Sequence, residues 1–243
     1  MPEDVLVFIA IGFLAQLVDG ALGMAFGALT TTSLLTFGVA PAAASAMTHV
    51  AEIFTTAASG ASHVYHRNVD WRLVVRLAPP GMIGGAVGAY LLTVIDSRVV
   101  APLVSLYLVA IGLYILFRAY RPSWPREVRD RIVPFVGAAG GFLDAAGGGG
   151  WGAVVTGSLV GRGHQPRKVI GSTNLTEFLV TAVISATFVL SLGWAELSSA
   201  IGLIIGGVVA APLGGLLVSR VPTRPLTVAV GVVIIATSVA RFL

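Results

Sequence analysis

The chain has 243 residues, of which 56% are hydrophobic and only 11% are charged. A soluble globular domain carries about 25% charged residues, so this composition excludes a water-soluble domain and indicates an integral membrane protein. The net charge of +4 does not indicate a nucleic-acid partner, because basic residues of membrane proteins gather in cytoplasmic loops. The sequence has no cysteine, which excludes disulfides and thiolate metal sites.

Six apolar runs are long enough to cross a bilayer, since a spanning helix needs about 20 apolar residues. We predict spans at Pro41–Gly60, Leu73–Ile95, Val99–Phe117, Val169–Leu190, Leu197–Val218 and Leu226–Phe242. Two further segments, Val5–Phe37 and Ile132–Gly161, are too long for one span and are interrupted by an aspartate and glycines. Their arms have about 14 residues or fewer, roughly 21 Å, which predicts two broken helical hairpins.

Basic residues gather in four of the segments that join the apolar runs. They are Arg67, Arg72 and Arg76; Arg118, Arg121, Arg126, Arg129 and Arg131; Arg162, Arg167 and Lys168; and Arg220 and Arg224. The positive-inside rule places all four clusters in the cytoplasm. Two of them flank the second broken segment, which is therefore predicted to enter and leave the membrane from the cytoplasmic side. By analogy the first broken segment enters from the outer side, so both termini are expected outside.

An internal repeat relates the two halves of the chain. Residues 16–60 shifted by 125 positions fall on residues 141–185 without a gap, with 14 identities in 45 positions. Each half then has one hairpin and three spans, and an odd number of spans inverts the second half relative to the first. Inverted repeats with broken helices at the bilayer midplane are typical of secondary transporters.

The predicted fold class is an all-α polytopic membrane protein of two inverted repeats, each a broken re-entrant helical hairpin plus three transmembrane helices. The first transmembrane repeat is predicted at residues 1–118 and the second at residues 132–243. Between them, residues 119–131 form a hydrophilic cytoplasmic linker.

Three stretches carry a resemblance to a known family: Gln16–Gly27, its repeat Gly140–Gly152, and Gly171-Ser172-Thr173-Asn174 leading into Glu177. With these motifs the sequence resembles the sulfite exporter TauE/SafE family of membrane permeases over essentially its whole length. The resemblance implies a multi-pass protein of the cell membrane, in bacteria the inner membrane. It also implies proton-coupled transport of small sulfur-containing anions such as sulfite or organosulfonates.

The two hairpin tips are the predicted substrate site. A helix that restarts after a break offers free N–H donors and the positive end of its dipole, which suits an anion, and glycines allow close approach. The candidate substrate-binding residues are Asp19, Gly20, Gly23, His49, Asp144, Gly147, Gly148, Gly149, Gly150, Thr173 and Asn174. The alternative for each aspartate is a purely structural role as the cap of its broken helix. The halves differ, since Asn174 stands where the first copy has His49.

Glu52 and Glu177 lie inside spans at equivalent repeat positions and are the candidate proton carriers, with His49 as a further one. Ionisable residues within a membrane are rare and face a cavity or a partner. A proton on either glutamate would remove its repulsion towards an anion, which is a simple coupling mechanism. The alternatives are a neutral glutamate in an interhelical hydrogen bond and a merely buried histidine.

The predicted function is therefore a secondary transporter in which one half rocks against the other to give alternating access. A passive anion channel that uses the same tips as a filter is the alternative. An enzyme is not expected, because the sequence has no HExxH, GxSxG or cysteine nucleophile. We expect no cofactor and no metal. The expected partners are a small anion, protons and lipid, with no nucleic acid, in a monomer or homodimer.

Overall fold

The computed structural model describes residues 2–22, 24–120, 130–161, 165–194, 200–218 and 223–242, and the secondary structure of these residues is entirely helical. The helices are α1 (Pro2–Leu22), α2 (Phe26–Thr36), α3 (Pro41–Tyr65), α4 (Trp71–Val94), α5 (Ser97–Tyr120), α6 (Val133–Gly147), α7 (Gly157–Gly161), α8 (Pro166–Leu192), α9 (Ala200–Val218) and α10 (Thr223–Ala240). A 3₁₀ turn (Asp130–Ile132) precedes α6, and a π-helical turn (Gly152–Thr156) precedes α7. This confirms the all-α prediction; most of the predicted linker lies outside the described residues.

Among the described residues, three helices are both long and apolar enough to cross a membrane, namely Trp71–Val94, Ser97–Tyr120 and Arg167–Leu192 in α4, α5 and α8. They coincide with three of the six predicted spans. α3 has 25 residues and therefore the length of a span, but it is less apolar because it carries buried Thr48, His49 and Glu52. The two spans expected at α9 and α10 are helical, with shorter apolar stretches at Ala200–Ala211 and Arg224–Ala240. Their crossing of the bilayer stays a prediction.

The first broken segment differs from its prediction. We expected arms of at most about 14 residues, but α1 runs for 21 residues and continues three residues past Asp19 to Leu22. The aspartate does not end its own helix because its carboxylate bonds to backbone beyond the break. In the second segment, α6 has 15 residues and ends at Gly147, close to the expected length.

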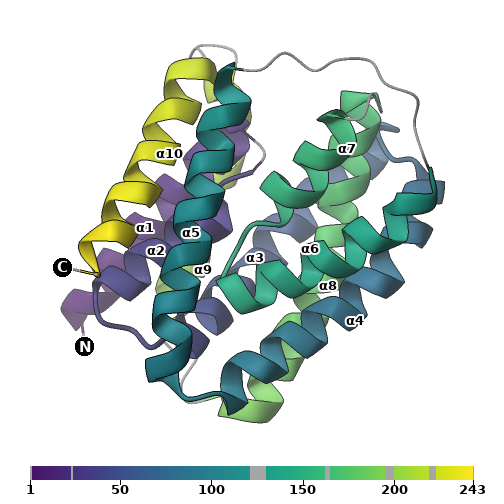
Figure 1. Cartoon of the computed structure of the whole chain (residues 1–243). Coiled ribbons are helices and arrows are strands. Elements are labelled where there is room, and N and C mark those ends of the chain that lie inside the picture. Colours follow the sequence, from purple (N-terminus) through teal and green to yellow (C-terminus); the bar gives the residue numbers. More distant parts are fainter. Residues whose placement is uncertain are drawn as a thin grey trace.

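The helix boundaries follow the internal repeat. α2 and α3 begin at Phe26 and Pro41, and the helical segments 125 residues later begin at Trp151 and Pro166. Packing is also equivalent but crosswise, since α1 lies against α9 while α6 lies against α4. α3 packs against its repeat partner α8, and α5 lies beside α10 (Figure 1). Each hairpin thus rests on the other half; the inverted orientation of the halves and the domain boundaries stay predictions.

Glycines allow the crosswise contacts. A Cβ on Gly84 of α4 would overlap the carbonyl oxygen of Ala138 in α6, and a Cβ on Gly206 of α9 would overlap that of Ile9 in α1. Small residues of this kind let helix backbones touch within a membrane, where packing rather than the hydrophobic effect holds helices together.

Two of the predicted cytoplasmic clusters meet in the structure. The Lys168 ammonium group donates hydrogen bonds to the carbonyl oxygens of Arg67 (2.9 Å) and Val69 (3.3 Å). The Ser172 hydroxyl accepts from the backbone N–H of Asp70 at 2.7 Å. The loop between α3 and α4 is therefore fastened to the start of α8, which agrees with the prediction that both clusters lie on one side.

Candidate functional site

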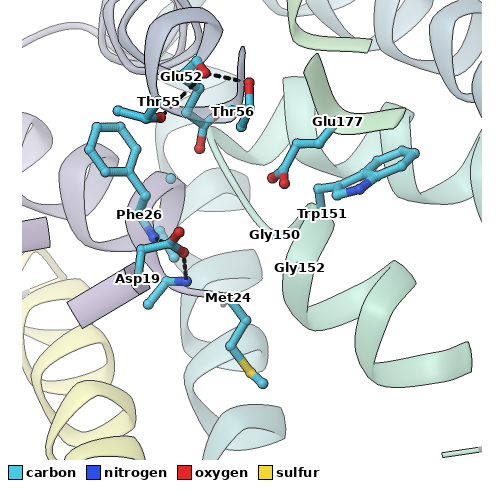
Figure 2. Close-up of a pocket in the computed structure, with 13 residues that line it drawn as sticks. Asp19, Met24, Phe26, Glu52, Thr55, Thr56, Gly150, Trp151, Gly152 and Glu177 are labelled. Atoms are coloured by element: carbon cyan, nitrogen blue, oxygen red, sulfur yellow. Dashed lines mark hydrogen bonds between the residues drawn. The ribbon is translucent and has the colours of Figure 1, made fainter. Parts of the chain in front are cut away.

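Asp19 lies in the last turn of α1 and turns its carboxylate towards the beginning of α2. Its Oδ1 accepts hydrogen bonds from the backbone N–H groups of Ala25 (2.7 Å) and Phe26 (3.1 Å) (Figure 2). A helix N-terminus leaves such N–H groups without an internal partner. The capping role of Asp19 is thus confirmed, and the aspartate ties the end of α1 to the start of α2.

Asp144 does the same in the second hairpin. Its Oδ1 accepts a hydrogen bond from the backbone N–H of Trp151 at 2.8 Å, across a turn of three glycines. These glycines have φ angles of +75°, +139° and +140° at Gly148, Gly149 and Gly150, which side chains other than hydrogen rarely allow. The tip is therefore a glycine turn closed by an aspartate, as the sequence predicts.

Three side chains of the first half hold the backbone of the second tip. The hydroxyl of Thr31 donates to the carbonyl oxygen of Gly148. The hydroxyl of Ser45 donates to that of Ala145 at 2.7 Å, and Tyr107 to that of Gly149 at 3.0 Å. Buried carbonyl groups without a partner are costly, so these bonds fix the tip in place.

The two tips touch through glycines. A Cβ built on Gly27 at the start of α2 would lie 2.8 Å from the Cα of Gly149 and 2.8 Å from Oε1 of Glu52. Side chains larger than hydrogen would separate the tips. The glycines therefore bring backbone from both hairpins next to a glutamate of α3.

A small cavity of about 20 Å³ lies at this meeting point. Its wall consists of Asp19, Met24, Ala25, Phe26, Gly27, Ala28, Glu52, Thr55, Thr56, Gly150, Trp151, Gly152 and Glu177. The carboxylates of Glu52 and Glu177 point into the same space from opposite sides (Figure 2). This volume has room for about one water molecule, which is too little for a larger anion.

Among the residues that the structure describes, the cavity wall contains three carboxylic acids and no Lys or Arg. Asp144, which is 1% exposed, also lies close enough to Glu52 for electrostatic repulsion between their negative charges. Charge in a low-dielectric interior is expensive unless it is paired or neutralised. An anion in this cavity would therefore be repelled unless protons neutralised these carboxylates.

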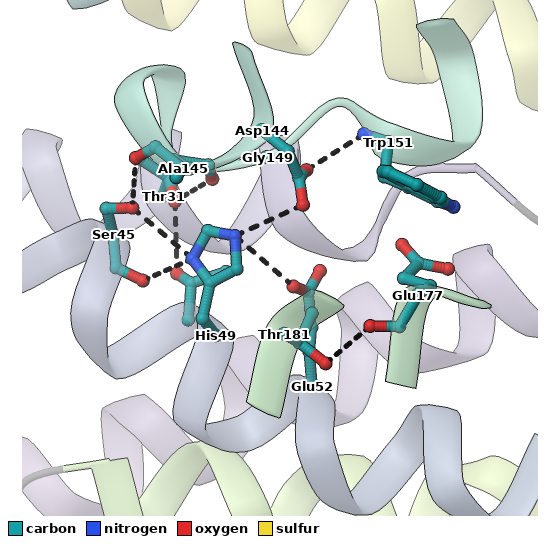
Figure 3. Close-up of polar contacts among 12 residues, drawn as sticks. Thr31, Ser45, His49, Glu52, Asp144, Ala145, Gly149, Trp151, Glu177 and Thr181 are labelled. Atoms are coloured by element: carbon teal, nitrogen blue, oxygen red, sulfur yellow. Dashed lines mark hydrogen bonds and ion pairs between the residues drawn. The ribbon is translucent and has the colours of Figure 1, made fainter. Parts of the chain in front are cut away.

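His49 joins the second tip to α3 beside this cavity (Figure 3). Its Nδ1 lies 2.7 Å from the carbonyl oxygen of Ser45, one turn earlier in the helix. Its Nε2 lies 3.2 Å from Oδ2 of Asp144 and 3.9 Å from Oε2 of Glu52. The imidazole thus stands between two carboxylates that come from different halves of the chain.

Comparison with known proteins agrees with this architecture. The sequence profile of the sulfite exporter TauE/SafE family matches residues 8–241. The chain belongs to the sulfite exporter TauE/SafE family. It is also 42% identical over 239 residues to the probable membrane transporter protein YtnM of Bacillus subtilis (strain 168), covering 94% of this chain and 79% of that protein. No solved structure matches it. As a TauE/SafE protein the chain is a multi-pass membrane transporter and not an enzyme.

The structure of this TauE/SafE protein brings most of the predicted site residues together. Asp19, Gly150, Glu52 and Glu177 line the cavity. His49 and Asp144 pair beside it, while Gly147 and Gly148 form the back of the second tip against Tyr107 and Thr31. Gly20 lies in the last turn of α1 outside the cavity wall, and Gly23 lies outside the described residues.

Thr173 and Asn174 have other contacts. The hydroxyl of Thr173 accepts from Thr156 at 2.8 Å, and its carbonyl oxygen accepts from the Trp151 indole at 3.2 Å. The first half has the equivalent contact, 3.0 Å between the hydroxyls of Thr31 and Thr48. Asn174 bonds to Ser59 and to the carbonyl oxygen of Ile170, so it does not take the role of His49 in the second half.

Several site residues were missed by the sequence interpretation. Ser45 stands four residues before His49 and so shares its helix face, a spacing that the sequence shows. Tyr107 lies in an apolar run, and its repeat position is Val232, so neither periodicity nor the repeat marks it. Phe26, Thr55 and Thr56 belong to the cavity wall as well.

The His49, Glu52 and Asp144 side chains could hold a metal ion, since one ligand atom of each lies within 4.8 Å of the others. The Nε2 and Oδ2 atoms are, however, at hydrogen-bonding distance from each other. The two buried side chains therefore satisfy each other by a direct hydrogen bond.

Proposed function

We propose that this protein is a proton-coupled secondary transporter of small sulfur-containing anions, such as sulfite or organosulfonates, in the bacterial inner membrane. The family's description names sulfite export, and the chain offers a site suited to a small anion. The observation that carries the proposal is the cavity where the two hairpin tips meet. There the restarting backbone at Ala25–Ala28 and Gly150–Gly152 faces Glu52 and Glu177.

The substrate is proposed to bind to the backbone of the tips, where the α2 N-terminus contributes N–H groups and the positive end of its dipole. Asp19 and Asp144 support this backbone through their capping bonds and need not touch the substrate. Gly27, Gly150 and Gly152 in the cavity wall let an anion approach closely. The cavity of about 20 Å³ has to widen before an anion larger than water can bind.

Proton coupling follows from the charge of the wall. A negative charge about 4 Å from an ionised carboxylate is repelled by about 4 kcal/mol at an effective dielectric constant of 20. That repulsion corresponds to roughly a thousandfold loss of affinity. A proton on Glu52 or Glu177 removes it, so anion and proton bind together. Rocking of one half against the other then exposes the site to either side.

Transport by purified protein in liposomes tests the proposal. Glu52→Gln and Glu177→Gln keep the size of each side chain and remove its charge, so we expect anion exchange without stimulation by a pH gradient. Asp96→Asn is the matched control: Asp96 is exposed, and its bond to the Arg98 N–H can be replaced by an asparagine oxygen. If both glutamine variants retain proton-coupled flux, the proposal that Glu52 and Glu177 carry the coupled proton is wrong. Passive electrogenic flux without a pH gradient would indicate a channel instead.

A further inference from the structure

The tautomer of His49 follows from its hydrogen bonds. The imidazole is completely buried, and its Nδ1 lies 2.7 Å from the backbone carbonyl oxygen of Ser45. A carbonyl oxygen can only accept, so Nδ1 has to carry a proton. In a neutral imidazole with a proton on Nδ1, the other nitrogen, Nε2, is an acceptor.

The opposite nitrogen faces a group that also accepts. Asp144 Oδ2 lies 3.2 Å from Nε2, and Oδ1 of the same carboxylate already accepts from the Trp151 N–H. Two acceptors at this distance bind each other only through a proton. That proton belongs either to an imidazolium opposite a carboxylate or to a carboxylic acid opposite a neutral imidazole.

Glu52 provides a second place for the same proton. Its Oε2 lies 3.9 Å from Nε2 on the same helix and has no hydrogen-bond partner among the described residues, although it is buried. A buried oxygen without a partner is unusual in a folded protein. Oε2 points towards Nε2 from the cavity side, whereas Asp144 approaches from the hairpin side (Figure 3).

We infer that His49 and Asp144 hold one proton in common between Nε2 and Oδ2, and that Glu52 Oε2 is the group to which this proton passes. In the transfer, the bond from the proton to Nε2 or Oδ2 breaks and an O–H bond forms on Glu52. His49 remains neutral with its Nδ1 proton, and Asp144 becomes a carboxylate whose Oδ2 lacks a donor, while Oδ1 still accepts from the Trp151 N–H. The His49–Asp144 contact between α3 and the second tip is thereby lost, and the Ser45–Ala145 bond between them remains.

The other charged and titratable groups around this proton favour a neutralised Glu52. Glu177 from α8 and Asp19 from α1 both repel a negative charge on Glu52, as does Asp144 from α6. Tyr107 from α5 faces Asp144. Passing the proton to Glu52 therefore neutralises the carboxylate that faces the cavity, where the proposed anion binds.

The internal repeat does not reproduce this proton relay of His49, Asp144 and Glu52. Asn174 occupies the repeat position of His49, and its amide bonds to Ser59 and Ile170. Asp19, the repeat counterpart of Asp144, uses Oδ1 for its cap at Ala25 and Phe26. This asymmetry provides a matched pair of variants.

Asp144→Asn removes the proton that could be transferred but keeps the hydrogen bonds of residue 144 to Trp151 and His49. The asparagine oxygen can accept from the Trp151 N–H, and its amide can donate to Nε2 of a neutral His49. The variant is therefore expected to fold with no transferable proton at this position. Asp19→Asn makes the same chemical change at the equivalent cap, away from His49.

The first measurement is ¹⁵N NMR of ring-labelled histidine in the full chain in lipid nanodiscs, with the His49 signals assigned by their loss in His49→Gln. We expect a protonated Nδ1 in the wild type, in Asp144→Asn and in Asp19→Asn. We expect Nε2 to change its signal in Asp144→Asn and to keep it in Asp19→Asn. An unprotonated Nδ1 in the wild type, or an unchanged Nε2 in Asp144→Asn, would overturn the shared proton.

The second measurement is anion flux in liposomes, and this part rests on the proposed function. Asp144→Asn is expected to lose the stimulation by a pH gradient, whereas Asp96→Asn, at an exposed residue outside the site, is expected to retain it. A full response to the gradient in Asp144→Asn would show that the coupled proton does not pass through this pair. If the wild type moves no sulfur anion at all, the proposed function fails while the NMR result still decides the shared proton.

Discussion

The contact between the two hairpin tips makes a quantitative prediction for Gly149→Ala. The new Cβ would overlap the backbone of Gly27, and the residue has a φ of +139° that alanine rarely adopts. Backbone strain at such a φ costs about 1–3 kcal/mol. Overpacking of a tight contact adds about 1–3 kcal/mol, so the stability should fall by about 2–6 kcal/mol in total.

Two further alanine variants separate the contribution of backbone strain from that of overpacking. Gly38 has a φ of +81° and no atom within 4 Å of its Cβ position, so Gly38→Ala measures strain alone. Gly27 lies in α2 with an ordinary helical φ, so Gly27→Ala measures contact alone. Its expected cost of about 1–3 kcal/mol is offset by up to about 1 kcal/mol of helix propensity.

The assay is thermal unfolding of the detergent-purified protein together with flux in liposomes. Gly149→Ala should be less stable than Gly38→Ala by about 1–3 kcal/mol, or about 2–12 °C in Tm for a chain of this size. Flux should fall in Gly149→Ala, because the displaced tip no longer faces Glu52. Equal Tm and equal flux in the two variants would refute the close contact between the tips.

Two other predictions concern the tip and the topology. Tyr107→Phe removes the donor to the Gly149 carbonyl, and a buried carbonyl without a partner should cost about 1–3 kcal/mol in thermal unfolding. Tyr90→Phe, at a residue 56% exposed, is its control and should be neutral; equal stability of the two variants would contradict the role of Tyr107. Because the chain has no cysteine, Tyr65→Cys and Trp194→Cys can be labelled singly with an impermeant reagent. We expect labelling of the first only from the cytoplasm and of the second only from outside, and labelling of both from one side would contradict the topology.

Local sequence signals predicted much of the fold. Long apolar runs predicted α4, α5 and α8 to within three residues at each end, because burial in lipid demands such runs. The two helix breaks were visible as an aspartate followed by glycines. The aspartates Asp19 and Asp144 cap these breaks as expected, because the first N–H groups of a helix have no acceptor within the helix.

The rest depends on contacts between residues far apart in the sequence. The pairing of His49 with Asp144 joins positions 95 residues apart and belongs to no repeat or motif. α1 continues past Asp19 because the carboxylate can bond across the break from within a helix, which composition does not reveal. Asn174 matches His49 in the alignment of the halves, but it bonds to Ile170 in its own helix, α8, and to Ser59 in α3.

The crosswise packing of the hairpins has a consequence for how the protein is made. α1 rests on α9, which begins at Ala200, so the first helix to be synthesised meets its partner only when most of the chain has been translated. Until then its packing surface lies against lipid or the insertion machinery. α6, by contrast, finds α4 already in place. The second hairpin can therefore settle during synthesis, whereas the first is completed last, although it is made first.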